Sequence, residues 1–230
     1  MLFPEPLRPA VLLRRYKRFL ADVRFPDDSI ATVHCPNSGS MLGCNAPGSP
    51  VLLSTSAHPG RKYPMTLEMV QVGGTWVGVN TGLTNGLVRE GLAAGLFPEL
   101  GRIEAIRAEV KTGESRLDFR LETDGGPVWL EVKNCSLAEN GTALFPDAVT
   151  SRGTKHLREL ARLRREGDNA AIIFCVQRAD ATSFAPAARI DPLYAATLVE
   201  VVGQGVLALA GQATVAPTGI SLDRRLPVRL

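Results

Sequence analysis

Asp118, Glu131 and Lys133 have residue types and a spacing that could form a divalent-metal site. Asp118 lies in one run of alternating polar and apolar residues, and Glu131 and Lys133 lie in the next such run. If the two runs pair, the carboxylates face each other and repel, which favours a bound cation between them. With the ammonium group on the same face, they predict a divalent-metal site with a positioned positive charge beside it.

A β-hairpin between Ser115 and Ser136 is the element that must position these residues. Hydrophobic residues recur at every second position of both runs, which is the period of a half-buried strand. They are Leu117, Phe119 and Leu121 in the first run, and Val128, Leu130 and Val132 in the second. The dipeptide Asp124-Gly125 between the runs favours a type I′ turn, in which both central residues need a positive φ.

The register of this hairpin decides the chemistry, and two registers are open. With Asp124-Gly125 as the loop, Asp118 faces Glu131 with Cβ atoms about 5 Å apart. With Gly125-Gly126 as the loop, Asp118 instead faces Lys133 and forms an ordinary cross-strand ion pair. The first register predicts the metal site, whereas the second predicts a purely structural contact.

The composition is that of an ordinary soluble globular protein. The chain has 230 residues, enough for one large domain or two small ones, with 45% hydrophobic and 21% charged residues and a net charge of +3. Segment 1–10 contains three prolines and no apolar stretch, so we expect no secretory signal. Segment 198–216 is apolar but interrupted by Glu200, Gln204 and Gln212, so we expect no membrane-spanning helix and no membrane partner.

The cysteines are few and irregularly spaced. They are Cys35, Cys44, Cys135 and Cys175, and no two of them form a C-x-x-C pair. This pattern favours reduced thiols and a cytoplasmic location over a disulfide framework. His34, Cys35 and Cys44 are conceivable zinc ligands, but a fourth ligand is missing from the pattern.

Short strands in residues 1–80 predict a small β-barrel. Besides the basic segment from Pro9 to Phe25, four further segments have strand patterns and are separated by Gly, Pro, Asn and Ser clusters. They are Ile30–His34, Val51–Thr55, Thr66–Val72 and Thr75–Asn80. Five short strands in a segment of this length favour a five-stranded oligonucleotide-binding (OB) barrel.

Two basic clusters in this barrel are interleaved with aromatic residues. Arg14, Arg15, Lys17 and Arg18 surround Tyr16, and Arg61 and Lys62 precede Tyr63. Cations and aromatic rings together suit a nucleic-acid backbone and its bases, so we predict these basic residues to bind nucleic acid. A solvated surface is the alternative explanation for each of them.

The remainder of the chain alternates helices and strands. We predict helices over Leu83–Leu96, from Thr150 or Ser151 to Glu166, and over Pro192–Gly203, and strands over Ala105–Lys111, Ala170–Gln177 and Val206–Thr214. With the hairpin, this order predicts an α/β sheet flanked by helices. The segment Glu109-Val110-Lys111 repeats the E-x-K pattern without a partner acid, and we interpret it as structural.

Two of these helices carry further candidate residues. Glu90 is the only acid of the first helix, and its carboxylate could reach the hairpin. In the second helix, Arg152, Lys155 and His156 lie in or near the first turn, directly after the hairpin, and we predict them to contact nucleic acid. A solvated helix face is again the alternative for these basic residues.

The order helix, strand, Asp-bearing strand, E-x-K strand, helix, strand resembles the PD-(D/E)xK nuclease superfamily. In that superfamily two acids hold Mg²⁺, and the lysine orients water or offsets charge at the phosphate. The resemblance therefore implies a Mg²⁺ or Mn²⁺ site with Asp118 and Glu131 as ligands, Lys133 as the catalytic lysine and Glu90 as the helical acid. One departure is that Leu117, rather than proline, precedes Asp118.

The chain as a whole resembles the sugar fermentation stimulation protein A family. The segments that carry the resemblance are RYKRFLADV, HCPNSGSM, KYPMTLE, WVGVNT, SRLDF, EVKN, LFPDAVTSRGTKHLREL, FCVQR and IDPLYA, in this order. The resemblance implies a DNA-binding protein with an OB-like barrel over residues 1–80 and a nuclease-like domain over residues 81–230. The name of the family also links it to sugar metabolism.

Two functions remain open at this point. The first is a Mg²⁺-dependent nuclease that hydrolyses phosphodiesters. The second is a non-catalytic DNA-binding regulator of sugar metabolism genes, which retains the fold without turnover. In both, the basic clusters at Arg14–Arg24 and Arg152–Arg165 predict salt-sensitive contacts to phosphates. Because no segment has the pattern of a recognition helix, we expect DNA to be bound with weak sequence specificity.

Overall fold

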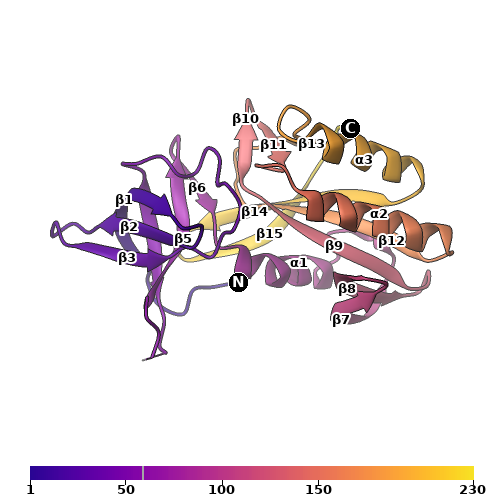
Figure 1. Cartoon of the computed structure of the whole chain (residues 1–230). Helices are drawn as coiled ribbons and strands as arrows, with labels where there is room; N and C mark the ends of the chain where they lie inside the picture. The colour runs from indigo at the N-terminus through magenta and orange to yellow at the C-terminus, as the bar shows by residue number, and fades with distance from the viewer. Residues whose placement is uncertain (59) are drawn as a thin grey trace.

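The computed structural model describes residues 1–58 and 60–230 and shows a β-barrel joined to a larger α/β domain (Figure 1). The first unit contains six strands. They are β1 (Arg8–Tyr16), β2 (Leu20–Arg24), β3 (Ile30–His34), β4 (Pro50–Thr55), β5 (Met65–Val72) and β6 (Thr75–Gly78). The strand order is β3-β2-β1-β4-β5-β6, and a parallel pairing of β3 with β5 closes five of the strands into a barrel. The predicted five-stranded barrel is therefore confirmed.

The basic segment that was predicted as a single strand region is two strands. Tyr16 and Leu20 face each other across a tight turn, in which Lys17 and Arg18 have φ values of +49° and +63°. Non-glycine residues rarely adopt a positive φ, so this turn has none of the Gly or Asn residues that usually reveal one. The basic residues of this segment are therefore divided between the two strands and the turn.

The second unit begins directly after the barrel. It contains the short 3₁₀ helices η1 (Thr81–Leu83) and η2 (Pro98–Leu100), and the helices α1 (Thr84–Ala93), α2 (Ser151–Arg165) and α3 (Pro192–Gly203). Its strands are β7 (Ile103–Thr112), β8 (Ser115–Thr123), β9 (Val128–Cys135), β10 (Leu137–Glu139), β11 (Thr142–Phe145), β12 (Asn169–Val176), β13 (Ser183–Pro186), β14 (Leu207–Ala216) and β15 (Gly219–Leu226). All three predicted helices and all the predicted strands of this half are present, whereas β10, β11, β13 and β15 were not predicted.

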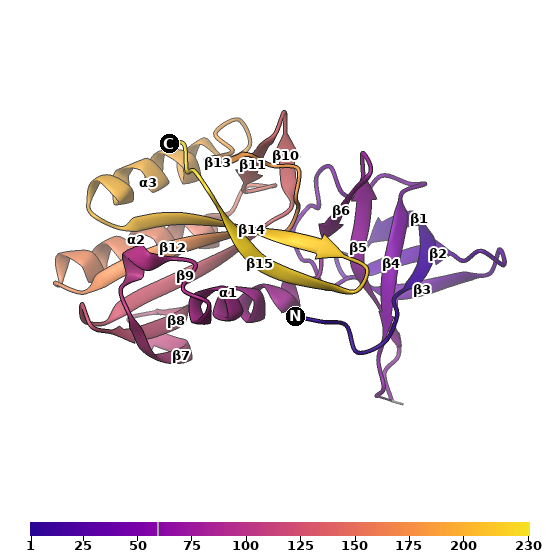
Figure 2. The same ribbon diagram turned by 180° about the vertical axis from the view of Figure 1, so that it is seen from behind.

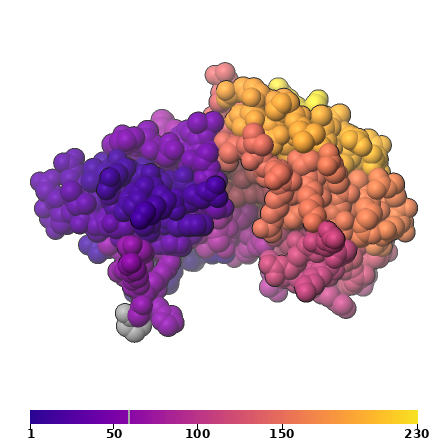
Figure 3. All heavy atoms as spheres, in the orientation of Figure 1, coloured from indigo at the N-terminus to yellow at the C-terminus, as the bar shows by residue number. Residues whose placement is uncertain are grey.

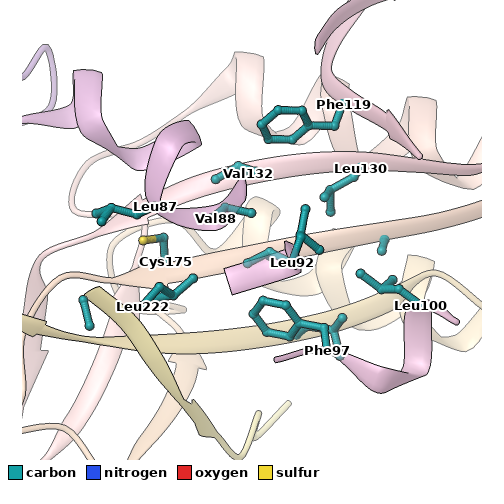
Figure 4. Packing of buried hydrophobic residues seen from close by; sticks show 14 of the residues in the cluster. Leu87, Val88, Leu92, Phe97, Leu100, Phe119, Leu130, Val132, Cys175 and Leu222 are labelled. Atoms are coloured by element: carbon teal, nitrogen blue, oxygen red, sulfur yellow. The ribbon is translucent and has the colours of Figure 1, made fainter. Parts of the chain in front are cut away.

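Helices cover both faces of a six-stranded sheet in this unit. The strand order is β15-β14-β12-β9-β8-β7, and β12 lies parallel to both of its neighbours (Figure 2). On one face, Leu87, Val88 and Leu92 of α1 pack with Phe119, Leu130 and other buried residues of the sheet (Figure 4). On the other face, α2 and α3 pack against β12. The continuous apolar run from Ala170 to Val176 is buried on both faces, as its sequence predicts.

The hairpin adopts the first of the two predicted registers, in which position 118 corresponds to position 131. The pairs Phe119–Leu130, Arg120–Trp129 and Leu121–Val128 define it. The predicted type I′ turn is wrong, because the positive φ lies at Gly126 rather than at Asp124 and Gly125. This arrangement is that of a type I turn followed by a left-handed glycine, which preserves the same register.

In the part of the chain that the structure describes, no helix is long and apolar enough to cross a membrane. All four cysteines carry free, buried thiols, as the sequence predicts. The zinc site considered for His34, Cys35 and Cys44 is not formed, because Cys35 contacts Met41 and Cys44 contacts the carbonyl of Ser136. Nor does any cluster of three or more His, Cys, Asp or Glu side chains that could hold a metal ion occur among the described residues.

Candidate active site

Glu131 lies at the centre of the candidate site. It belongs to β9, is 2% exposed, and points toward α2. The Lys133 ammonium and the His156 imidazole Nδ1 both contact its Oε1 atom. Burial opposes the ionisation of Glu131, but the hydrogen bond from His156 and the charge of Lys133 outweigh burial and lower the pKa of this carboxyl. Glu131 is therefore a buried carboxylate that stays charged because two cationic or donor groups surround one of its oxygens.

Asp118 is the second acid of the site and has a different environment. Its Oδ1 accepts a hydrogen bond from Asn85 Nδ2 of α1 at 2.9 Å, and its Oδ2 accepts one from the backbone N–H of Val132 at 2.8 Å. Burial and the negative charge of Glu131 raise the pKa of Asp118, despite these two hydrogen bonds and the charge of Lys133. The charge of Glu131 thus acts on Asp118, and the pKa values of the two carboxyls shift in opposite directions: that of Asp118 is raised and that of Glu131 is lowered. Such paired, divergent carboxyls are typical of functional sites.

The pairing of β8 with β9 stops just before Asp118. Counted from the hairpin turn, Phe119 and Leu130 are the last residues that pair. The Asp118 side chain accepts a hydrogen bond from the Val132 N–H, which would bond to a backbone carbonyl of β8 if the pairing continued. Leu117 consequently packs in the core under α2, whereas Phe119 and Leu121 pack under α1. Along β8 the predicted alternation is observed, with Leu117, Phe119 and Leu121 buried and the polar residues between them more exposed.

The donor set suits a divalent cation. Oε2 of Glu131 is buried and, in the described part of the chain, has no hydrogen-bond partner. A buried oxygen of a charged carboxylate without a partner is costly unless a cation or water occupies the space beside it. Asp118 supplies a second carboxylate nearby, and hard oxygen ligands of this kind are those that Mg²⁺, Mn²⁺ and Ca²⁺ prefer. The site would offer two protein carboxylates to such a cation.

Glu90 is the predicted site residue that the structure does not bring to this place. Its carboxylate is 51% exposed and pairs with the amino group of Met1 at 2.8 Å. The α1 residue that does reach the site is Asn85, which contacts Asp118. Residues five apart on a helix point in directions about 140° apart, so Asn85 and Glu90 cannot both face the hairpin. The prediction of Glu90 as a site residue thus does not match the geometry.

His156 lies inside the site rather than on the surface. Its imidazole is buried, with Nδ1 on Glu131 and Nε2 accepting a hydrogen bond from Arg152 Nε at 3.5 Å. The prediction that His156 contacts nucleic acid directly is therefore corrected to a contact with the buried acid. Nothing in the local sequence distinguishes this histidine from its exposed neighbour Lys155, because the contact joins α2 to β9 across the fold.

Basic residues surround a pocket that opens next to His156. The pocket has a volume of about 560 Å³ and is lined by Lys111 and Arg116 from the β7–β8 hairpin and by Arg152 and Lys155 from α2. Glu109 of the second E-x-K segment pairs with Arg116 at 2.8 Å on the surface, in agreement with the structural interpretation of that segment. Lys155 lies 3.6 Å from Glu114. The predicted basic residues Arg152 and Lys155 therefore lie beside the acids, on the side of the site away from the barrel.

The predicted basic residues of the barrel have different environments. Arg14 pairs with Asp22 at 2.8 Å. Arg15 donates hydrogen bonds to the backbone carbonyls of Arg18, Asn37, Gly39 and Ser40, so it organises the loop after β3. Lys17 and Arg18 are exposed in the β1–β2 turn.

Arg61 and Lys62 lie elsewhere on the barrel, in the loop between β4 and β5. Arg61 contacts the His34 imidazole at 2.9 Å, and Lys62 lies 5.5 Å from the ring centroid of Tyr63. Lys17, Arg18, Arg61 and Lys62 therefore remain exposed cations, whereas Arg14 is neutralised and Arg15 is structural.

A cleft of about 590 Å³ separates the barrel from the second domain (Figure 3). Arg15, Arg18 and the loop 37–40 line it from the barrel, and residues 134–137 and 144–150 line it from the second domain. Asp147 ties the two sides together, because its Oδ2 accepts the Met41 N–H at 2.8 Å and its carbonyl accepts the Ser40 hydroxyl at 2.6 Å. The loop His34–Ser40 thus forms part of the wall of this cleft.

Comparisons with known proteins follow the division of the fold. The SfsA N-terminal OB domain matches residues 13–79, and the sugar fermentation stimulation protein RE domain matches residues 82–219. The chain is 54% identical over 229 residues to a sugar fermentation stimulation protein homolog of Geobacter sulfurreducens, covering 99% of this chain and 98% of that protein. A homolog of the same name from Geobacter metallireducens is 53% identical over 232 residues and is covered completely.

A solved structure is similar over the whole chain. The structure of Pyrococcus furiosus SfsA in complex with Ca²⁺ superimposes with a TM-score of 0.91 and 31% sequence identity, covering 100% of this chain and 98% of that chain.

Proposed function

The chain belongs to the sugar fermentation stimulation protein (SfsA) family, and we propose that it is a cytoplasmic DNA-binding protein that hydrolyses phosphodiester bonds with a divalent cation. Asp118 and Glu131 would hold the cation, Mg²⁺ or Mn²⁺, and Lys133 is the positive charge beside it. The observation that carries the proposal is the buried, charged Glu131, with one oxygen held by Lys133 and His156 and the other without a partner.

Each residue of the site has a defined task in this proposal. When bound, the cation supplies Lewis acidity toward a phosphate oxygen and lowers the pKa of a bound water. Lys133 places its ammonium at the edge of the site, where it offsets the negative charge that develops on the phosphate. Asn85 and the Val132 N–H fix the orientation of Asp118, and His156 fixes that of Glu131.

Two further observations support the proposal. The relative from Pyrococcus furiosus was solved in complex with Ca²⁺, a cation with the same preference for oxygen ligands as Mg²⁺. In addition, the exposed cations Lys111, Arg152 and Lys155 line the pocket beside the acids, where they suit the phosphates on either side of a bond under attack. Contacts of this kind do not read bases, so we expect weak sequence specificity.

A second candidate function is a DNA-binding regulator of sugar metabolism genes without catalytic activity. The observation that favours it is that Lys133 and His156 both bind the Oε1 atom of Glu131, so this oxygen already has protein partners. Exposed cations on both domains would still bind the phosphates of DNA, without base recognition.

One experiment separates the two candidates. Supercoiled plasmid and labelled oligonucleotides are incubated with the wild type, Lys133→Ala and Glu90→Gln in Mg²⁺, Mn²⁺ or EDTA. We expect metal-dependent cleavage by the wild type and by Glu90→Gln, whose carboxylate lies outside the site, and loss of cleavage by at least about 100-fold in Lys133→Ala. Cleavage that persists in Lys133→Ala would remove the proposed mechanism.

Binding measured across salt concentration completes this test. A steep fall of affinity with salt and no cleavage by the wild type would select the regulator, because phosphate contacts then remain without turnover. A flat salt dependence would contradict both candidates, since each relies on the exposed cations for its affinity.

A further inference from the structure

We infer that Arg152 is a positioning residue of the candidate cation site, which acts on Glu131 through His156. The inference rests on the proposed function for the presence of a cation, and it gives Arg152 a task beyond supplying positive charge. Its basis is the lining of the basic pocket, the contacts of His156 and the hydrogen-bonding chemistry of the guanidinium group.

The basic pocket of about 560 Å³ adjoins the acids, because His156 forms part of its wall. The imidazole of His156 is buried, and its Nδ1 atom contacts Glu131. One ring therefore lies between the pocket and the buried carboxylate. The interdomain cleft, in contrast, is lined neither by His156 nor by the two acids. A side chain in the basic pocket can thus act on Glu131 through His156.

The contact between Arg152 and His156 fixes where the imidazole carries its proton. The two residues are four apart on α2, so their side chains share one face of the helix. Arg152 Nε lies 3.5 Å from Nε2 of His156. A guanidinium in a protein stays charged and only donates hydrogen bonds, so Nε2 must be the acceptor. A neutral imidazole that accepts at Nε2 carries its proton on Nδ1, the atom that contacts Glu131.

This tautomer determines which oxygen of Glu131 is left for a cation. Lys133 and the Nδ1–H of His156 both donate to Oε1, and Oε2 is the buried oxygen without a partner in the described part of the chain. In the other tautomer, Nδ1 would present a lone pair to Oε1, and the two acceptors would repel each other. The carboxylate would then turn away from His156, and Oε2 would lose its orientation.

The charge of Arg152 taken alone predicts the opposite effect on a cation. A positive charge near the site repels a divalent cation, so removal of a basic residue from the pocket should tighten cation binding. Lys155 provides the comparison, because it lies on the same helix, lines the same pocket and is 3.6 Å from Glu114 rather than in contact with His156. If Arg152 acts by position, its removal should instead weaken cation binding. The sign of the change therefore separates position from charge.

Calorimetric titration of Mn²⁺ into the metal-free protein, without DNA, measures this sign. The variants are Arg152→Met and, as the matched control, Lys155→Met. Both substitutions remove one positive charge from the same pocket and keep an unbranched side chain. Thermal unfolding of each protein in EDTA checks that the fold is retained.

We expect Arg152→Met to bind Mn²⁺ about 10-fold more weakly than the wild type. This is the lower end of the roughly 10- to 100-fold losses seen when an outer-shell partner of a metal ligand is removed. Lys155→Met should bind Mn²⁺ as tightly as the wild type or more tightly. An affinity of Arg152→Met within twofold of the wild type, or a higher one, would overturn the inference.

Nitrogen-15 NMR of the histidine rings in EDTA gives a second readout, which needs neither the cation nor activity. The chain has three histidines, and the spectrum of His156→Gln identifies the signals of this ring. We expect the neutral Nδ1–H tautomer of His156 in the wild type and in Lys155→Met, and a loss of this single tautomer in Arg152→Met. A wild-type ring that is an imidazolium, or that carries its proton on Nε2, would contradict the inference even if a variant failed to fold.

Failure of the inference is distinct from failure of the proposed function. If the wild type binds Mn²⁺ and cleaves DNA, but Arg152→Met changes neither the tautomer nor the affinity for Mn²⁺, only the inference is overturned. If Arg152→Met changes both, but Lys133→Ala cleaves as the wild type does, the hydrolytic mechanism is overturned and the positioning role of Arg152 is supported.

Discussion

Replacing Asp118 by asparagine should stabilise the metal-free protein and abolish its stabilisation by divalent cations. Burial and the charge of Glu131 raise the pKa of Asp118, which means that its ionised form costs free energy in the folded state. An amide of the same shape removes that cost. It still accepts the Val132 N–H, and the Asn85 amide can turn to accept from it. The same substitution removes one of the two carboxylates of the proposed cation site.

The two effects have opposite signs and measurable sizes. Relief of an unfavourable buried charge is worth about 1 kcal/mol, in the range seen when strain at a functional site is removed. For a chain of this length that raises Tm by about 2–4 °C. A cation at 100 times its Kd stabilises the folded wild type by about 2.7 kcal/mol, or about 5–10 °C, and should not stabilise the variant. Asp118→Asn should therefore be more stable than the wild type in EDTA and less stable than the wild type at saturating cation.

Thermal unfolding of the wild type, Asp118→Asn and Glu90→Gln in EDTA, Mg²⁺, Mn²⁺ and Ca²⁺ measures this inversion. Trp129 is in the sheet of the second domain and Trp76 of β6 packs against the core of the same domain, so tryptophan fluorescence follows the unit that carries the site. Glu90→Gln serves as the control and should retain the full shift with cation. The sign of the pH effect gives a second check: the advantage of Asp118→Asn in EDTA should shrink as the pH falls and Asp118 becomes protonated. A variant less stable than the wild type in EDTA, or one still stabilised by cations to the same extent, would refute the reasoning.

Three further substitutions test other parts of the structure. The Thr150 hydroxyl caps α2, so Thr150→Ala should cost about 1 kcal/mol in urea unfolding and Thr150→Ser should cost little; equal stability of all three proteins would contradict the assignment of the cap. A Cβ at Gly78 would collide with the side chain of Gln177, so Gly78→Ala should destabilise the junction of the two domains by about 1–3 kcal/mol, measured in the same way; a neutral result would contradict the close approach. Hydrogen bonding to Arg162 lowers the pKa of Glu159, so this residue stabilises the fold above its unfolded pKa of about 4.3 and loses that effect as the pH falls through its folded pKa. Glu159→Gln should therefore reduce the loss of stability at acid pH, measured as the free energy of unfolding against pH. The same loss in the variant and the wild type would exclude this contribution.

The sequence predicts α2 and α3 well because the ends of these helices have strong local signals. Thr150 caps α2, and Gly167 follows it with φ of +99°, as expected for a helix stop. Asp191 caps α3 by accepting the Tyr194 N–H, and Pro192 occupies its first position. These interactions join residues within one turn, so they are visible in the sequence without knowledge of the fold.

Two features that the sequence did not predict, the β1–β2 turn and β13, lack such local signals. The β1–β2 turn is made by Lys17 and Arg18 in left-handed conformations, so no Gly, Asn or Pro marks it. The strands β10, β11 and β13 are only three or four residues long. Asn140-Gly141 joins β10 to β11 with φ values of +48° and +75°, as in a type I′ turn, so this hairpin has a local signal that the sequence analysis did not use. β13 instead forms by pairing with the distant β11, a contact that local patterns do not contain.

The candidate site divides in the same way between what is local and what is not. Alternation and hairpin register place Asp118, Glu131 and Lys133 together because all three lie within one supersecondary unit. Asn85 and His156 come from helices on opposite faces of the sheet, and their contacts follow only from how α1 and α2 pack. Glu90 was predicted instead of Asn85 because the sequence favours the charged residue, whereas the rotation of α1 is set by the packing of Leu87, Val88 and Leu92.

The separation of β8 from β9 at Asp118 connects the fold to the proposed chemistry. A regular hairpin ladder would satisfy the Val132 N–H with a backbone carbonyl and would leave the two facing carboxylates pressed together on one flat surface. Here the carboxylate of Asp118 takes that N–H, the ladder ends, and Asn85 approaches from α1 while His156 approaches Glu131 from α2. Residues from both faces of the sheet thus hold the two acids in place. The two carboxylates share no bond that would offset the repulsion between their charges. A divalent cation would relieve that residual repulsion, so the irregularity of the hairpin and the proposed affinity for a cation would have a common origin.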